Sequence, residues 1–149
     1  MSEHGVRLEW TVDKHHEREG TYSRDHRAII SPTVTIPVSA APDYLGNESL
    51  ADPEQLLVNA LASCHMLYFL ALCEASGYAV ESYSDNAVGK VEKSADGFHW
   101  VSEIVLRPRV TFKSEKQPNP AQLERLHHRA HKGCFIANSI KSKVDIELG

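Results

Sequence analysis

The 149-residue sequence is poor in the residues that define several protein classes. Its three cysteines, an odd number, argue against a disulfide-stapled secreted scaffold and fit a reducing cytoplasm. Eight glycines and seven prolines are too few for a collagen-like chain. Sixteen Lys and Arg residues against 20 Asp and Glu residues leave a net charge of −4, so the chain lacks the basic excess that neutralises phosphates. We therefore expect neither nucleic acid nor a membrane surface as a partner.

Several sequence motifs are also missing. The chain has no glycine-rich phosphate loop and no Gly-x-Ser-x-Gly elbow, and residues 1–4 lack the basic-then-apolar pattern of a signal peptide. The most apolar stretch, Leu56 to Cys73, is interrupted by polar residues and is marginal in length for a membrane span. With 42% hydrophobic residues, the sequence predicts one cytoplasmic domain over residues 1–149.

The strongest local pattern predicts a helix from Pro53 to Ser76. Asp52 suits the N-cap, Gln55 completes the spacing of a capping box, and Gly77 suits the C-cap. Apolar residues cover most of the circumference of this helix, so it must be covered on nearly all sides. One small sheet covers only part of it, and we therefore expect help from a second subunit.

Alternating apolar residues and turn signals place strands on both sides of this helix, and a second helix follows near the C-terminus. Asp96-Gly97 is a hairpin signal inside the strand-rich region after the long helix. The pattern predicts strands over 6–12, 21–30 and 33–38, a loop over 39–51, strand-rich stretches over 78–93 and 98–112, a helix over 121–132, a turn or short helix over 134–139, and a final strand over 144–148. The fold class that follows is α+β.

Cys64, Cys73 and Cys134 are candidates for redox chemistry, although any free cysteine can be inert core packing. Cys73 lies nine residues after Cys64, on the opposite face of a regular helix, so these two cannot pair within it. We expect Cys73 to be core. Only the fold can bring Cys64 and Cys134 together.

His127, His128 and His131 suggest a metal site together with Cys134. The helix has no His-Glu-x-x-His pattern and no second close cysteine pair, so a fourth ligand would have to come from Cys64. We therefore expect no metal site and no cofactor, and interpret the histidines as a solvated cluster at a helix C-terminus, where cations are favoured.

Arg24 and Glu54 are the charged candidates for a thiol site. An arginine lowers the pKa of a nearby thiol, and a carboxylate can hold its guanidinium in place. In the alternative reading, Arg24 is a solvated strand residue and Glu54 interacts only with the helix dipole.

These residues resemble the osmotically inducible protein C and organic hydroperoxide resistance (OsmC/Ohr) family. The resemblance is carried by Asp52-Pro53-Glu54-Gln55-Leu56-Leu57 with Cys64 ten residues after Glu54, by Cys134 in Cys-Phe-Ile-Ala-Asn-Ser, and by the position of Arg24. It covers nearly the whole chain. It implies an OsmC-like fold, with antiparallel sheets wrapped around long central helices in an intertwined homodimer, and active sites at the subunit interface.

The resemblance also implies a stress-response peroxidase that reduces organic hydroperoxides to alcohols. Cys64 would become a sulfenic acid and then form a disulfide with Cys134, while Arg24, held by Glu54, stabilises the thiolate. Arg18 and Arg27 are alternatives to Arg24. A dithiol, which the family suggests is carried by a lipoylated protein, would reduce the disulfide.

The geometry of a helix limits what Glu54 can do. In an unbroken helix, Glu54 and Cys64 are about 15 Å apart along the axis. Either the helix breaks between them, or Glu54 serves Cys64 of the partner subunit.

The apolar residues Met66, Leu67, Phe69 and Phe135 are candidates for the wall of a substrate pocket, and the alternative is that they are core residues. Two other functions fit the same sequence. One is a thioesterase-like hydrolase, in which the cysteines are dispensable. The other is a non-enzymatic redox-sensing or ligand-binding dimer that uses Cys64 and Cys134 as a switch.

Overall fold

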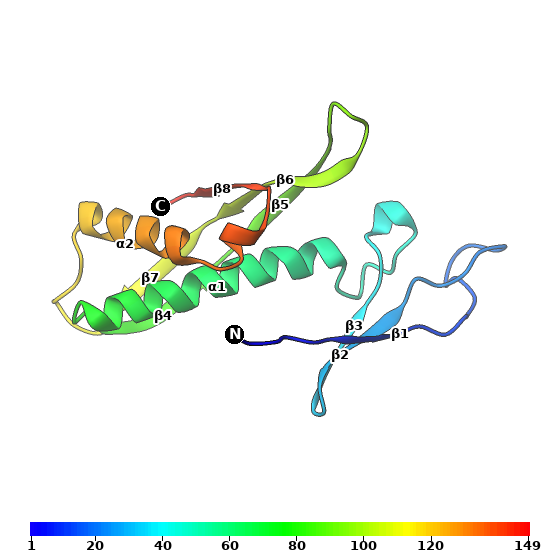
Figure 1. Ribbon diagram of the computed structural model, residues 1–149, viewed down its shortest axis with the longest axis horizontal. Helices are drawn as coiled ribbons and strands as arrows, with labels where there is room; N and C mark the ends of the chain where they lie inside the picture. Colours follow the sequence, from blue (N-terminus) through cyan, green and yellow to red (C-terminus); the bar gives the residue numbers. More distant parts are fainter. The chain divides into compact units, whose positions relative to one another are not determined.

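The computed structural model describes residues 1–149, and these residues form two compact units, Met1–Leu56 and Leu57–Gly149. The boundary falls inside one continuous helix, so the single domain expected from the sequence stays a prediction. The units are described separately below, and Figure 1 labels their elements.

The N-terminal unit is a three-stranded antiparallel sheet in the order β1-β2-β3. Its strands are β1 (Arg7–Glu9), β2 (His26–Ser31) and β3 (Val34–Val38). The three predicted strands are confirmed and pair as an antiparallel meander, although β1 and β2 are shorter than expected and residues 10–25 form a loop between them. A single 3-10 turn, Pro42–Tyr44, interrupts the predicted loop that leads to the long helix.

The long helix α1 (Pro53–Ala75) begins and ends where its capping residues predict. The backbone N–H of Gln55 donates to the Asp52 carboxylate over 2.8 Å, and the Gln55 side chain accepts from the Asp52 N–H over 2.9 Å. This is the expected capping box. At the other end, Gly77 adopts a φ of 77°, which allows the N–H of Tyr78 to bond to the Cys73 carbonyl.

One stripe of α1 is fully buried. Leu61, His65, Phe69 and Cys73 recur every four residues, while the rest of the helix is half-buried or exposed. By length and composition α1 could cross a membrane. The stripe packs instead inside the fold, and it contains a histidine that is hydrogen-bonded to a second helix.

The C-terminal unit holds two further sheets. The antiparallel pair β4-β7 joins β4 (Val80–Asp85) to β7 (Pro108–Phe112). The second sheet has the order β5-β6-β8 and contains β5 (Val88–Lys93), β6 (His99–Leu106) and β8 (Lys143–Ile146). The predicted hairpin at Asp96-Gly97 joins β5 to β6, and Gly97 has the positive φ of 89° that the turn requires.

Two features of these sheets differ from the expectation. Each predicted strand-rich stretch is divided into two strands that pair with different partners, because Asn86–Ala87 and Arg107 interrupt the pairing. Strand β8 runs parallel to β6, so the sheets are not purely antiparallel. The parallel pairing follows from the crossover through helix α2 (Pro120–Gly133), which returns the chain to the same end of the sheet.

Two buried clusters hold the C-terminal unit together, and α1 contributes to both. In the first, Leu61 packs with Ile104 and Leu106 of β6 and with Cys134. In the second, Phe69 and Cys73 pack with Leu126 and Ala130 of α2. Helix α1 is therefore packed against the β5-β6-β8 sheet along one part of its length and against α2 along another.

Candidate active site

Cys64 and Cys134, which are 70 residues apart in the sequence, lie next to each other in the C-terminal unit. Cys64 is half-buried on α1 and packs against the cluster that contains Cys134. Cys134 is fully buried directly after α2. Both are free thiols.

The turn that follows α2 positions Cys134. Its backbone N–H bonds to the His131 carbonyl at the end of the helix, and its carbonyl accepts from the Asn138 N–H over 3.1 Å. The N–H of Ala137 donates to the Cys134 Sγ over 3.4 Å. The turn therefore fixes both the backbone and the sulfur of Cys134.

The two thiols have different surroundings. Burial raises the pKa of the Cys134 thiol, the Ala137 N–H opposes this, and the neighbouring Cys64 raises the pKa further. Cys134 is thus held as a protonated, inaccessible thiol, and solvent or a solute can reach only Cys64 of the two. Such a pair can accept an oxidising equivalent at Cys64 and share it with Cys134 as a disulfide.

Cys73 is confirmed as a core residue. It has no exposed surface, lies in the Phe69 cluster, and burial raises its pKa to about 11. A thiol in this state is a weak nucleophile at neutral pH.

Arg24 is held within the N-terminal unit by its own neighbours. Its guanidinium donates to Thr21 Oγ1 over 2.9 Å and to the Tyr22 carbonyl, and it lies 3.9 Å over the Tyr22 ring. Of the other two candidate arginines, Arg27 pairs with Glu9 over 3.2 Å, and Arg18 lines a surface cavity. The role of Arg24 stays a prediction.

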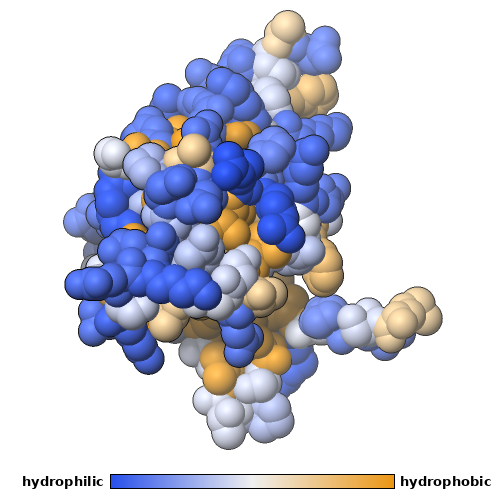
Figure 2. All heavy atoms as spheres, turned by 90° about the vertical axis from the view of Figure 1, so that its left-hand side faces the viewer, coloured by the Kyte–Doolittle hydropathy of each residue, from blue (hydrophilic) through white to orange (hydrophobic).

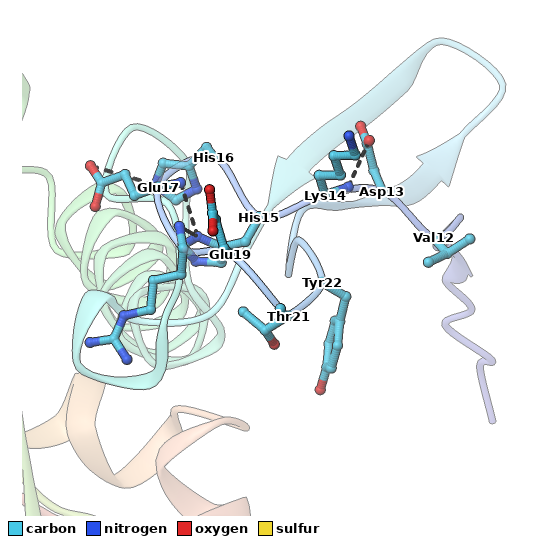
Figure 3. Close-up of a pocket in the computed structure, with 11 residues that line it drawn as sticks. Val12, Asp13, Lys14, His15, His16, Glu17, Glu19, Thr21 and Tyr22 are labelled. Atoms are coloured by element: carbon cyan, nitrogen blue, oxygen red, sulfur yellow. Dashed lines mark hydrogen bonds and ion pairs between the residues drawn. The ribbon is translucent and has the colours of Figure 1, made fainter.

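The loop that precedes Arg24 encloses that cavity, which has a volume of about 990 Å³ (Figure 3). His15 fixes the loop. Its Nδ1 accepts from the backbone N–H groups of Glu17 and Arg18, and its Nε2 donates to the Leu45 carbonyl over 2.8 Å. The ring is therefore a structural link between the loop and the segment that leads to α1.

Glu54 lies in the first turn of α1, and its Oε2 is buried without a hydrogen-bond partner. No ion pair joins it to Arg24 in this chain. Because α1 is continuous from Pro53 to Ala75, a break between Glu54 and Cys64 is excluded. The other possibility, action of Glu54 on the partner subunit's site, stays a prediction.

The four predicted pocket residues have very different environments. Leu67 and Phe135 are exposed by 62% and 76%, and Met66 is half-buried. Phe69 has no exposed surface, because it stacks on His127 and contacts the tilted ring of Tyr83 in the core. Three of the four residues can therefore contact a solute, whereas Phe69 packs in the core.

The interpretation of the three histidines as a solvated cluster is wrong for His127. His127 is 2% exposed, and its Nδ1 lies 2.9 Å from Nε2 of His65, which is 1% exposed. Each falls on the buried stripe of its helix, beside Leu126 in α2 and between Leu61 and Phe69 in α1. The four-residue spacing of that stripe in α1 is the signal that could have identified His65.

Comparison with known proteins gives a consistent result. The family described as OsmC-like protein matches residues 46–149. The structure is similar to an OsmC-like protein of unknown function from Vibrio cholerae, with 41% identity, complete coverage of both chains and a TM-score of 0.92. It also resembles the organic hydroperoxide resistance protein OhrB of Bacillus subtilis, with 15% identity, coverage of 97% and 96%, and a TM-score of 0.65, which shows the fold alone.

A curated relative is the uncharacterized protein YmaD of Bacillus subtilis, which is 26% identical over 125 residues and covers 83% of each chain. The α+β architecture with two helices agrees with the fold expected from the sequence. The chain belongs to the OsmC-like family.

Proposed function

We propose that this protein is a cysteine-based peroxidase that reduces organic hydroperoxides to alcohols. The observation that supports this most directly is the contact between a solvent-accessible thiol, Cys64, and a buried thiol, Cys134. Family membership agrees with it, since solved structures of this fold include proteins titled as organic hydroperoxide resistance proteins.

In the first step, the Cys64 thiolate attacks the terminal oxygen of R–O–O–H. The O–O bond breaks, the alkoxide takes a proton and leaves as the alcohol, and Cys64 becomes a sulfenic acid. Arg24 stabilises the thiolate and the charge that develops on the peroxide oxygens, and Glu54 orients Arg24.

In the second step, the Cys134 sulfur attacks the sulfenic sulfur. A Cys64–Cys134 disulfide forms, and the hydroxyl leaves as water with the proton that Cys134 gives up. The contact between the two thiols supports this step, because the disulfide needs only a local rearrangement. A dithiol reductant, which we propose is a lipoylated protein, returns both cysteines to thiols.

We propose a homodimer as the working form. Leu67, Tyr68 and Phe135 are exposed, and apolar residues reach the surface among polar ones in Figure 2. A second copy would cover such residues. The unpartnered Glu54 carboxylate supports a pairing across the subunits with the partner's site. The free thiols suit a cytoplasmic protein.

The test is turnover of an alkyl hydroperoxide with dihydrolipoamide as reductant. We expect steady turnover by the wild type and by Cys73→Ala, and loss of turnover in Cys64→Ser. Unchanged turnover in Cys64→Ser would remove the mechanism. A single stoichiometric oxidation without cycling would instead identify a redox switch.

A further inference from the structure

A cavity of about 530 Å³ lies between α2 and β8 in the C-terminal unit, and nothing in the proposed reaction uses it. This volume is within the range of small-molecule sites. The lining residues are Ala121, Glu124, Arg125, His127, His128 and His131 around α2, with Val144, Asp145, Ile146 and Leu148 in and after β8.

Contacts with His65 and Phe69 hold the ring of His127 within this lining. Its Nδ1 is hydrogen-bonded to His65 Nε2 over 2.9 Å, and the two rings are parallel within 3°. The ring also stacks on Phe69, with ring centroids 4.2 Å apart. A ring held by these two contacts is pre-organised to recognise a ligand, since little of its freedom remains to be lost on binding.

Two ring nitrogens of this lining are buried without a partner, namely His127 Nε2 and His131 Nδ1. Buried polar atoms without hydrogen bonds are rare in native proteins, and a bound molecule is one cause. No group of three or more ligating side chains is arranged to hold a metal ion there.

The hydrogen bond between His65 and His127 determines whether Nε2 of His127 is a hydrogen-bond donor or an acceptor. Both rings are neutral, since burial lowers the pKa of each to about 4. One bond between two neutral imidazoles leaves one outer nitrogen as a donor and the other as an acceptor, and a shift of tautomer exchanges them. His127 Nε2 can therefore either donate to a ligand oxygen or accept from a ligand hydroxyl.

The wall of the cavity that faces α2 is formed by β8 and the residues after it, and it is mostly apolar. Val144 and Ile146 line the cavity and also pack against the cluster that contains Cys134. Asp145 between them is compensated by Lys143 at 3.0 Å. Where the buried His127 ring meets these aliphatic side chains, a charged occupant is disfavoured, and the charged residues of the lining are Glu124, Arg125 and Asp145.

We propose that this cavity is a second binding site, for a small uncharged molecule that is mostly apolar and carries one hydroxyl or carbonyl oxygen, which His127 binds. The site is independent of the proposed peroxidase reaction, so binding can be tested whether or not turnover is observed.

The experiment is a titration of the full-length protein with cyclohexanol, followed by NMR of the histidine ring nitrogens and of the backbone amides of Val144 and Ile146. We expect saturable shifts at the His127 ring and at both amides. His127→Phe retains an aromatic ring on Phe69 and should weaken binding about tenfold, the effect of one lost hydrogen bond. His99→Phe, the same change at the exposed first residue of β6, should leave the affinity within about twofold of the wild type.

Leu148→Trp places a large side chain at the cavity, should abolish binding, and provides a second variant if His127→Phe does not fold. The absence of saturable shifts in the wild type, or unchanged affinity in folded His127→Phe, would overturn the proposal. So would binding of cyclohexanecarboxylate as tight as that of cyclohexanol, which would indicate an anion site at Arg125. NMR shifts that change with protein concentration but not with cyclohexanol concentration would also overturn it, because they would show that a second copy of the chain covers the cavity.

Discussion

Mild acid should destabilise this protein through the buried pair His65 and His127. Burial lowers the pKa of His65 from 6.5 to about 4, and His131 adds to the shift. Burial also lowers the pKa of His127 to about 4, and His65 adds to it. Both rings are neutral in the fold at pH values where they are partly protonated in the unfolded chain.

The sign of the effect follows from this difference. A group whose pKa is lower in the folded state binds more protons when unfolded, so acid favours unfolding. The stability that the neutral pair contributes is fully present above pH 6.5 and is lost as the pH falls toward about 4. At about pH 5 each ring should lower the free energy of unfolding by about 2 kcal/mol relative to about pH 7.5, and the two together by at most about 4 kcal/mol.

The assay is urea unfolding followed by circular dichroism at these two pH values and at one protein concentration. The double variant His65→Leu/His127→Phe removes both partners of the hydrogen bond and keeps apolar volume, so it should fold. It should lose about 2 to 4 kcal/mol less than the wild type on acidification. His128→Gln changes an exposed histidine of the same helix and should retain the full loss.

An equal loss of stability in the wild type and the double variant would refute the reasoning. It would mean that the two rings are as accessible to protons in the folded protein as in the unfolded chain. The other titratable groups are the same in the wild type and the double variant, so their contributions to the loss of stability cancel in this comparison.

Three further predictions follow from the structure. Cys134→Ser should complete one reduction of hydroperoxide and then accumulate sulfinic acid at Cys64, seen as a mass increase of the Cys64 peptide, and a reversible cycle without Cys134 would contradict its role. Cys73→Ala should leave the peroxidase rate unchanged and lower the free energy of unfolding by about 1 to 2 kcal/mol, because it opens a small cavity beside Phe69, and a large loss of rate would contradict its place in the core. Asn119→Ala removes the capping box of α2, in which Asn119 accepts from the Gln122 N–H over 2.8 Å, and should cost about 1 kcal/mol in thermal or urea unfolding, whereas an unchanged midpoint would show that the cap contributes nothing.

The features that the sequence predicted well are local ones. The start of α1 follows from Asp52, Pro53 and Gln55, and its end from Gly77, because caps and turns depend on neighbouring residues. The β5-β6 hairpin follows from Asp96-Gly97 for the same reason.

The features that could not be predicted from the sequence depend on contacts between distant parts of the chain. The parallel pairing of β8 with β6 is set by where α2 returns the chain, which no local pattern encodes. The burial of His127 depends on which face of α2 meets Phe69 and on a hydrogen-bond partner 62 residues away. The proximity of Cys64 to Cys134 was expected from the family resemblance, because composition and spacing alone left both as possible core residues.

The proposed function depends on the sulfur atoms of Cys64 and Cys134. The most direct test is to oxidise the protein with one equivalent of alkyl hydroperoxide and to identify the modified cysteines by peptide mass spectrometry. The account predicts an intrachain disulfide between Cys64 and Cys134 and a free thiol at Cys73. A disulfide that includes Cys73, or oxidation of Cys64 to sulfinic acid while Cys134 stays a thiol, would contradict it.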